Sequence, residues 1–381
     1  MESCVNAMEE SDYSKLPLFG TSWDISAAFD SVARPLIELS LRRLGGPQAI
    51  AEFLAHIDDD EVRISTPGTE NGRLGMTFHT ERGVGQGDSI SPNLWIAFFD
   101  IMLTALNIGT EADFYYIDRE GAVHTTPDCA FADDLLSISG CLETIQKKAD
   151  ILSALGIILD INFSHKKFRT FTYNVHGIHE ISLHNVNWEE IRVPLQGDSF
   201  ITYLGATMNL DHSSSEEEKI LQAMITEIKL RSTRKVDTPE HHTRYEQAAV
   251  MPALTYRTQF AKVRTSKLEA LAKRLRIHAK EQVHLPKSFP TALLEGPSKE
   301  GGVGLEGLVD VAARTKLRLI ESSLNNTATQ DIRSAVEGLL ARELRRQGSL
   351  LSGQTGEIGS SSSIGNTWIS EAIKHLRDTN V

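Results

Sequence analysis

Apolar residues are spaced along this chain of 381 residues in two distinct patterns. Short, nearly continuous apolar runs are typical of β-strands, and they occur at residues 16–23, 61–66, 72–81 and 129–139. Apolar residues at helical spacing occur over residues 30–44, 47–57, 92–106, 141–156 and 215–230. Strands alternate with helices up to about residue 210, and helices follow. The pattern therefore predicts an α+β sheet domain and then a mainly helical domain.

These patterns divide the chain into five expected parts. They are an N-terminal tail at residues 1–15, a sheet domain at 16–212, a helical domain at 213–346, a low-complexity linker at 347–366 and a C-terminal helix at 367–381. The N-terminus is acidic and unlike a signal peptide, and no apolar run approaches the roughly 18–20 residues of a membrane span. We therefore expect an intracellular protein, nuclear or cytoplasmic, that is neither secreted nor bound to a membrane.

Charge is distributed unevenly within a net charge of −12. Residues 1–200 hold 14 basic and 30 acidic side chains, whereas residues 229–280 hold 13 basic and 4 acidic ones. Such asymmetry is typical of a protein that holds a polyanion beside an acidic, metal-binding site. A solvated basic face on a helix gives the same pattern, so charge alone leaves both interpretations open.

Two adjacent aspartates, Asp133 and Asp134, interrupt the apolar run CAFADDLLSIS. A tight turn between two strands would carry both carboxylates out of the core, where their repulsion favours a bound divalent cation. Asp24 follows another short strand. If the two strands are neighbours, three carboxylates meet at one end of a sheet and can hold two Mg²⁺ ions for phosphoryl transfer. An aspartate pair by itself is more often a solvated turn, so it does not decide the function.

Four motifs in a fixed order carry more information. They are DISAAFDSV at residues 24–32, GVGQGDSISPNLW at 83–95, FADD at 131–134 and YLG at 203–205. In this order they resemble the motifs of reverse transcriptases, in particular those of retrotransposons that lack long terminal repeats (LINE type). The resemblance implies a polymerase palm, an antiparallel sheet with packed helices, followed by a helical thumb. It also implies an RNA-directed DNA polymerase that uses an RNA template, a DNA primer, deoxynucleotides and two Mg²⁺ ions, or Mn²⁺ in their place.

The resemblance also implies roles for single residues. Asp24, Asp133 and Asp134 would be the catalytic carboxylates that bind the metals, and the backbone carbonyl of Ile25 would face one of them. The ring of Phe29 would occupy the space of a 2′-hydroxyl and so favour deoxynucleotides. The remaining implied contacts are Gln86 and Gly87 with the nucleotide or template, Lys166 with the departing pyrophosphate as proton donor, and Tyr203, Leu204 and Gly205 with the primer.

The basic segment falls where reverse transcriptases have their thumb, and it would contact phosphates of the template and primer. Such contacts hold position without reading sequence, so we expect binding that is sensitive to salt and largely independent of sequence. The candidate contacts are Arg231, Arg234, Lys235, Arg257, Lys262, Arg264, Arg274 and Arg276.

Some assignments stay open at this level. The family spacing places His165 where the proton donor is expected, with Lys166 and Lys167 directly after it. Gly85 stands where the family often has arginine, although Arg82 is near. A dinucleotide-binding loop is disfavoured because GVGQG lacks the G-x-G-x-x-G spacing. Phe29 and the Ala before the aspartate pair fit a viral RNA-dependent RNA polymerase poorly.

The start of the chain suggests a second hypothesis. Only 23 residues precede Asp24, and they show no fingers region with basic residues for a triphosphate. No endonuclease pattern occurs either, so a missing region or another chain would supply the nicking activity. We therefore expect a fragment or a truncated element. The alternative to an active polymerase is a catalytically inactive remnant of palm and thumb with at most nucleic-acid binding.

Overall fold

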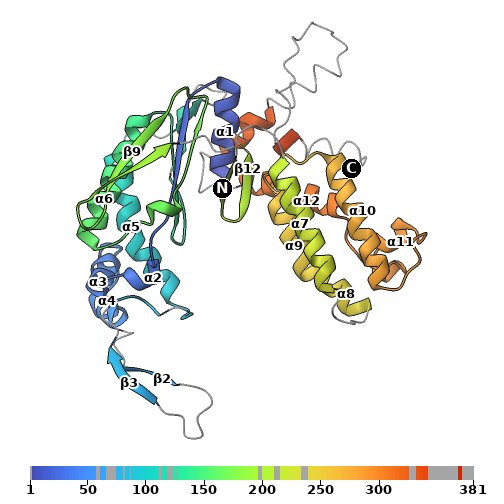
Figure 1. The fold of residues 1–381 in the computed structure, drawn as a ribbon, viewed down its shortest axis with the longest axis horizontal. Coiled ribbons are helices and arrows are strands. Elements are labelled where there is room, and N and C mark those ends of the chain that lie inside the picture. Colours follow the sequence, from blue (N-terminus) through green and yellow to red (C-terminus); the bar gives the residue numbers. More distant parts are fainter. Residues whose placement is uncertain are drawn as a thin grey trace. The chain divides into compact units, whose positions relative to one another are not determined.

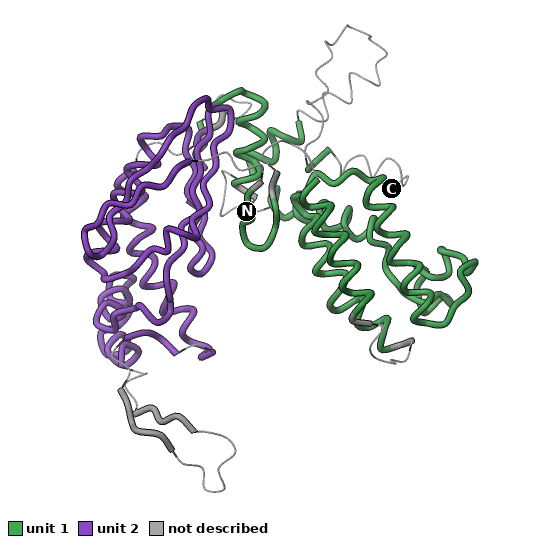
Figure 2. Tube along the Cα trace, viewed as in Figure 1, with its two compact units in different colours: residues 1–16, 116–124, 197–381 green, residues 17–115, 125–196 purple. Residues whose placement is uncertain are grey.

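The chain forms two compact units, which are described separately (Figure 2). Unit 2 comprises Pro17–Tyr115 and Thr125–Gln196, and unit 1 comprises Met1–Leu16, Tyr116–His124 and Gly197–Val381. The structure, a computed structural model, describes residues 2–56, 61–65, 74–79, 82–85, 87–110, 114–117, 123–126, 128–195, 200–209, 215–232, 239–325, 332–341 and 368–370.

Unit 2 has a four-stranded antiparallel sheet at its centre, in the order β6-β7-β1-β8. Figure 1 draws the strands of the chain as arrows. Its strands are β6 (Cys129–Phe131), β7 (Asp134–Ser139), β1 (Leu18–Trp23) and β8 (Arg169–Tyr173). The register pairs Trp23 with Leu135 on one side of β1 and Ser22 with Arg169 on the other. Two further hairpins of unit 2 are β2 (Glu61–Ser65) with β3 (Leu74–His79) and β9 (His179–His184) with β10 (Glu190–Leu195). Strands β4 (Phe114–Ile117) and β5 (Val123–Thr126) also pair.

The helices of unit 2 bury the sheet's apolar side chains. Helix α6 packs on β1 and β7, and α5 packs on α6 and α3. The helices are α2 (Ala28–Ser31), α3 (Arg34–Arg43), α4 (Gln48–Ala55), α5 (Ser91–Gly109) and α6 (Leu142–Leu159), with a 3-10 turn η1 at His165–Lys167. The sheet with packed helices confirms the predicted α+β class. The single helix predicted at residues 30–44 is wrong in one respect, because α3 begins only at Arg34, after two extended residues, with Pro35 in its first turn.

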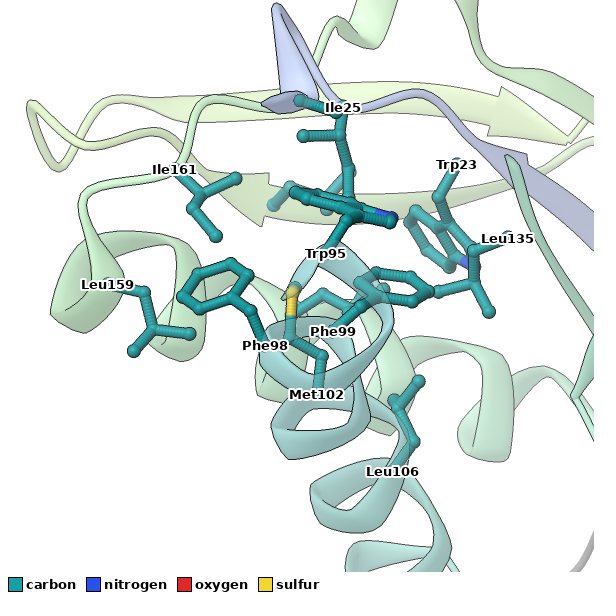
Figure 3. Close-up of a cluster of buried hydrophobic side chains, with 14 of the residues drawn as sticks. Trp23, Ile25, Trp95, Phe98, Phe99, Met102, Leu106, Leu135, Leu159 and Ile161 are labelled. Atoms are coloured by element: carbon teal, nitrogen blue, oxygen red, sulfur yellow. The ribbon is translucent and has the colours of Figure 1, made fainter. Parts of the chain in front are cut away.

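Helix α5 supplies much of the core of unit 2. Figure 3 shows Trp95 under Ile25, with Phe98, Met102 and Leu106 following along the helix; all four of these α5 side chains are fully buried. At 19 residues and a mean hydropathy of 1.2, α5 is long and apolar enough to cross a membrane by length and composition. The expectation that no apolar run approaches such a length is therefore wrong. The reason is that a helix buried in a protein core needs the same apolar residues as a helix in lipid.

Unit 1 is mainly helical, as predicted for the second half of the chain. Its hairpin is β11 (Phe200–Tyr203) with β12 (Ala206–Asn209). The apolar core includes Leu221, Leu254 and Leu271, which lie on three different helices. The helices are α7 (Ser215–Ser232), α8 (Pro239–Tyr245), α9 (Met251–Thr258), α10 (Thr265–Gln282), α11 (Thr291–Glu295) and α12 (Leu308–Asn325), with a π-helical turn η2 (Glu246–Val250) and a 3-10 turn η3 (Ser298–Glu300).

The N-terminal end of the chain differs from its predicted form. The expected N-terminal tail is helix α1 (Glu2–Ser14), and its Glu9 is buried beside Lys262, whose Nζ lies 3.5 Å away. The backbone N–H of Trp368 donates to Glu9 Oε1 at 3.1 Å. Burial raises the pKa of Glu9, and Lys262 partly offsets that rise. Of the predicted C-terminal helix, the described residues 368–370 are helical, and the predicted linker lies outside the described residues.

Candidate nucleotidyl-transfer site

The aspartate pair lies at the tip of the β6–β7 hairpin. Phe131 pairs with Asp134, so Ala132 and Asp133 form a two-residue loop. Ala132 has φ of +52°, the left-handed region that glycine adopts most easily and that hairpin loops of this length require. Leu135 and Leu136 after the turn are fully buried, whereas Asp133 and Asp134 are partly exposed. The apolar strands thus hold a strained turn that keeps both carboxylates outside the core.

Asp24 meets this turn because β1 and β7 are neighbours. Trp23 pairs with Leu135, so Asp24 follows the last residue of β1 at the end of the sheet where Asp134 begins β7. The pKa of Asp134 is raised by burial first, then by the negative charges of Asp133 and Asp24. All three carboxylates therefore act on one another at one end of the sheet.

A lysine also reaches this cluster, and it is not the one preferred from the sequence. Lys167 Nζ lies 3.2 Å from Asp24 Oδ1. This oxygen is buried, and the angle between the two groups does not make the ion pair a hydrogen bond. Lys166, the residue chosen from the sequence, is exposed on the same 3-10 turn. The turn is joined to the site by the N–H of Ser164, which donates to the carbonyl of Asp24 at 2.8 Å. The HKK sequence signals a cation here, but only this turn decides which lysine faces Asp24.

Ile25 bridges to Phe163 through backbone bonds of the flanking residues. Its side chain is buried in the core, and the bridge does not use its own carbonyl, because the two bonds join Ser26 to Asn162 and Ser164 to Asp24. The carbonyl of Ile25 is therefore directed away from Phe163, and nothing in this pairing prevents it from facing a ligand.

Phe29 lies on α2, and its backbone carbonyl accepts a hydrogen bond from the glycine loop, residues 83–87. The N–H of Val84 donates to the carbonyl of Phe29 at 2.9 Å, and that of Gly83 donates to Val32 at 2.8 Å. Gly83 has φ of +91°, and a Cβ there would lie 3.0 Å from the backbone of Asp30, so a side chain would break this contact. The loop therefore depends on a glycine at residue 83 for its close approach to α2.

The rest of the loop is only partly described. Gly87 is exposed with φ of +93° and open space around its Cα, whereas Gln86 lies outside the described residues. Arg82, the cation nearest the missing family arginine, forms a salt bridge with Asp160 and donates to the carbonyl of Ser31 at 2.9 Å. Arg82 thus fastens the loop to α2 and to the end of α6.

The predicted primer contacts lie in unit 1, on the β11–β12 hairpin. Tyr203 is buried and pairs with Ala206, and the turn residues Leu204 and Gly205 both have positive φ, at +50° and +76°. The hydroxyl of Tyr256 on α9 donates to the carbonyl of Leu204 at 2.6 Å. The turn is therefore held by the helical unit, which the sequence did not indicate.

The basic segment divides into internal and exposed cations. Arg257 faces Glu217 at 3.6 Å, Lys262 faces Glu9 at 3.5 Å, and Arg276 bonds to Glu295 at 2.7 Å. These ion pairs lie inside unit 1. Arg264 and Arg274 are exposed, whereas nothing is described of the side chains of Arg231, Arg234 and Lys235.

The carboxylates suit a hard divalent cation, since such ions take oxygen ligands and carboxylates above all. Burial, followed by the negative charges of Asp133 and Asp24, raises the pKa of Asp134, and a bound cation would offset the repulsion among the three carboxylates. As the side chains stand, however, the described residues contain no group of three His, Cys, Asp or Glu placed to hold a metal ion. The structure therefore shows the donor set but no assembled coordination sphere.

Comparisons with known proteins agree with this geometry. Residues 2–208 match the family model described as reverse transcriptase (RNA-dependent DNA polymerase). The chain is 25% identical over 352 residues to the Pol polyprotein of the type-2 retrotransposable element R2DM of Drosophila melanogaster, covering 86% of this chain and 31% of that protein. It is 25% identical over 303 residues to that of a type-1 retrotransposable element R2 of Popillia japonica, covering 74% and 45%. The chain thus spans less than half the length of these relatives.

Two telomerases are among the solved structures that match the chain. One from Candida albicans, in complex with a fragment of telomeric RNA, has a TM-score of 0.41 at 10% identity and covers 88% of this chain and 52% of its own. Apo telomerase from Candida tropicalis has a TM-score of 0.39 at 12% identity and covers 88% and 56%. The family match spans more than half of the chain. The chain therefore belongs to the reverse transcriptase family and is a reverse transcriptase domain of the non-LTR retrotransposon type.

Proposed function

We propose that this domain extends the 3′-hydroxyl of a DNA primer on an RNA template, taking deoxynucleotides as substrates and releasing pyrophosphate. The observation that carries the proposal is the meeting of Asp24 with the Asp133–Asp134 turn at one end of the sheet. Burial first, and then the charges of Asp133 and Asp24, raise the pKa of Asp134 there. Reverse transcriptases generally use divalent metal ions. Here Asp24, Asp133 and Asp134 would hold two Mg²⁺ ions, or Mn²⁺, which supply positive charge to the attacking and leaving oxygens.

The protein's own groups have three tasks in this reaction. The sheet holds the three carboxylates at a fixed place, which is the main requirement for an in-line transfer of a phosphoryl group. We assign the exclusion of a 2′-hydroxyl to Phe29, whose ring lies 5.7 Å from that of Trp95 between centroids. We assign to Lys167, whose Nζ lies 3.2 Å from Asp24 Oδ1, the donation of a proton to the departing pyrophosphate when Asp24 takes other partners.

The test is primer extension by the purified chain on an RNA template with a DNA primer, Mg²⁺ and deoxynucleotides. Asp133→Ala removes a charge that is worth several kcal/mol in the transition state, so we expect a rate at least about 1000-fold lower. Asp150→Ala is the matched control, because Asp150 lies exposed on α6 and accepts a hydrogen bond from Gln146 on the same helix.

The outcomes separate the two hypotheses. Extension that depends on Asp133 and not on Asp150 supports the polymerase. Absence of extension by the wild-type chain, with retained binding of the primer and template, supports the inactive remnant. Extension that survives Asp133→Ala would show that the carboxylates have another role.

A further inference from the structure

We propose that Trp95 is a positioning residue that holds the Ala132–Asp133 peptide in the orientation that the catalytic carboxylates need, and that couples this turn to Phe29. The inference rests on the proposed function. It adds to the site a residue that lies beyond the metal-binding aspartates and contacts no reacting atom.

The indole of Trp95 bonds directly to the aspartate turn. Its Nε1–H donates to the carbonyl of Ala132 at 2.8 Å. That carbonyl belongs to the same planar peptide unit as the nitrogen of Asp133, so fixing one fixes the other. The bond therefore sets the direction in which the Asp133 side chain leaves the backbone.

The turn needs such a support because Ala132 lies in the left-handed region with φ of +52°. A residue with a Cβ is unfavourable there, and such a conformation persists only when its surroundings hold it. The turn sits at the end of two strands, and Ala132 itself is exposed. The strands alone do not fix the peptide plane beyond them, whereas a hydrogen bond from a rigid, fully buried indole does.

Trp95 is itself held on all sides. Its ring stacks on Phe99 at 5.4 Å between centroids and lies 5.8 Å from Phe98, and Figure 3 shows Ile25 directly over it. Aromatic packing of this kind leaves the indole little freedom to rotate. The donor is therefore preorganised before any substrate arrives.

The ring of Trp95 also packs against Phe29, the residue that we propose to face the sugar of the nucleotide. Phe29 lies 5.7 Å from Trp95 between centroids, at an interplanar angle of 31°. Trp95 thus touches the ring that would face the nucleotide sugar and bonds to the turn that carries Asp133. A shift of this one side chain would move both groups together.

The experiment compares Trp95→Phe with Trp23→Phe in the full chain. Trp95→Phe keeps an aromatic ring in the core and removes the N–H that reaches Ala132. Trp23 is an equally buried tryptophan of the same core, and its N–H donates at 2.8 Å to the hydroxyl of Ser137, which belongs to β7 and not to the Ala132–Asp133 loop. Both variants lose one indole hydrogen bond, so the pair controls for a general loosening of unit 2.

For Trp95→Phe we expect kcat for primer extension about 10- to 100-fold lower, because small displacements of catalytic groups cost rates of this order. The Mg²⁺ concentration for half-maximal rate should rise several-fold, while KM for the primer and template stays unchanged. Mn²⁺ titrated into the chain without nucleotides, with the free ion followed by electron paramagnetic resonance, should show the same loss of affinity without any turnover. Trp23→Phe should keep the metal affinity of the wild type.

Two results would overturn the inference in a wild-type chain that extends primers. One is an equal loss of rate and metal affinity in both variants, which would mean that only core stability matters. The other is a wild-type metal dependence in Trp95→Phe. A wild-type chain that neither extends primers nor binds Mn²⁺ instead contradicts the proposed function itself.

Discussion

Lys148 and Asp128 form a buried ion pair that supports the aspartate hairpin from within unit 2. Lys148 lies on α6 and Asp128 immediately precedes β6, and Nζ donates to Oδ1 at 2.7 Å. The exposed fractions of the two side chains are 0% and 5%. Water therefore cannot take the place of either partner. Replacing Lys148 by Met keeps the length of the side chain but removes the cation that contacts the buried Asp128 carboxylate.

The expected cost follows from this burial. Removing one partner of a buried pair costs about 3–5 kcal/mol, which is a large part of the roughly 5–15 kcal/mol that stabilises a typical domain. We expect Lys148→Met to lower the free energy of unfolding of unit 2 by about that amount. The double variant Lys148→Met with Asp128→Leu should recover most of it, because no charge is then left buried.

Urea unfolding followed by circular dichroism measures these differences in a double-mutant cycle. The coupling energy between Lys148 and Asp128 should exceed about 1 kcal/mol, since the two side chains are in direct contact. A loss below about 1 kcal/mol for Lys148→Met, or additive effects in the cycle, would refute the reasoning that this pair is dry and mutually dependent.

Three further predictions concern the site and the thumb. The folded-state pKa of Asp134 is raised, so the contribution of Asp134 to stability is present in acid and is lost as the pH rises through that pKa. At neutral pH without metal, the Asp134→Asn variant should therefore unfold at a higher temperature than the wild type. An unchanged unfolding temperature would contradict this. Lys167→Ala should lower the extension rate well below that of Lys166→Ala in single-turnover assays, since only Lys167 contacts Asp24; equal effects would remove Lys167 from the site. Arg274→Ala should reduce the slope of log K against log salt concentration for template-primer binding by about one, with unchanged stability. Arg257→Ala should instead lower the urea concentration at the midpoint of unfolding, because Arg257 is paired with Glu217. A stable Arg257→Ala variant with a reduced salt slope would mean that this arginine contacts phosphate.

The sequence determined part of the secondary structure and the chemistry of the aspartate turn. The predicted ranges cover strands β1, β2, β3, β6 and β7 and helices α3 to α7. Apolar periodicity is local, and it identified β1, β7, α5 and α6 because each must bury one face. The FADD run predicted a hairpin tip, since two carboxylates cannot stay inside an apolar sheet. The order of four motifs gave the family because the spacing of such residues along a chain survives where overall identity is low.

Tertiary structure alone decided which side chains meet. Lys167 rather than Lys166 faces Asp24 because a 3-10 turn, tied to Asp24 by the backbone of Ser164, points it there. Trp95 reaches Ala132 only because α5 packs beneath the sheet. Two arginines and one lysine of the basic segment form ion pairs within the helical unit, which charge counts cannot show. The physical reason is the same in each case: periodicity fixes which face of an element is buried, whereas a contact between distant residues depends on how two elements pack.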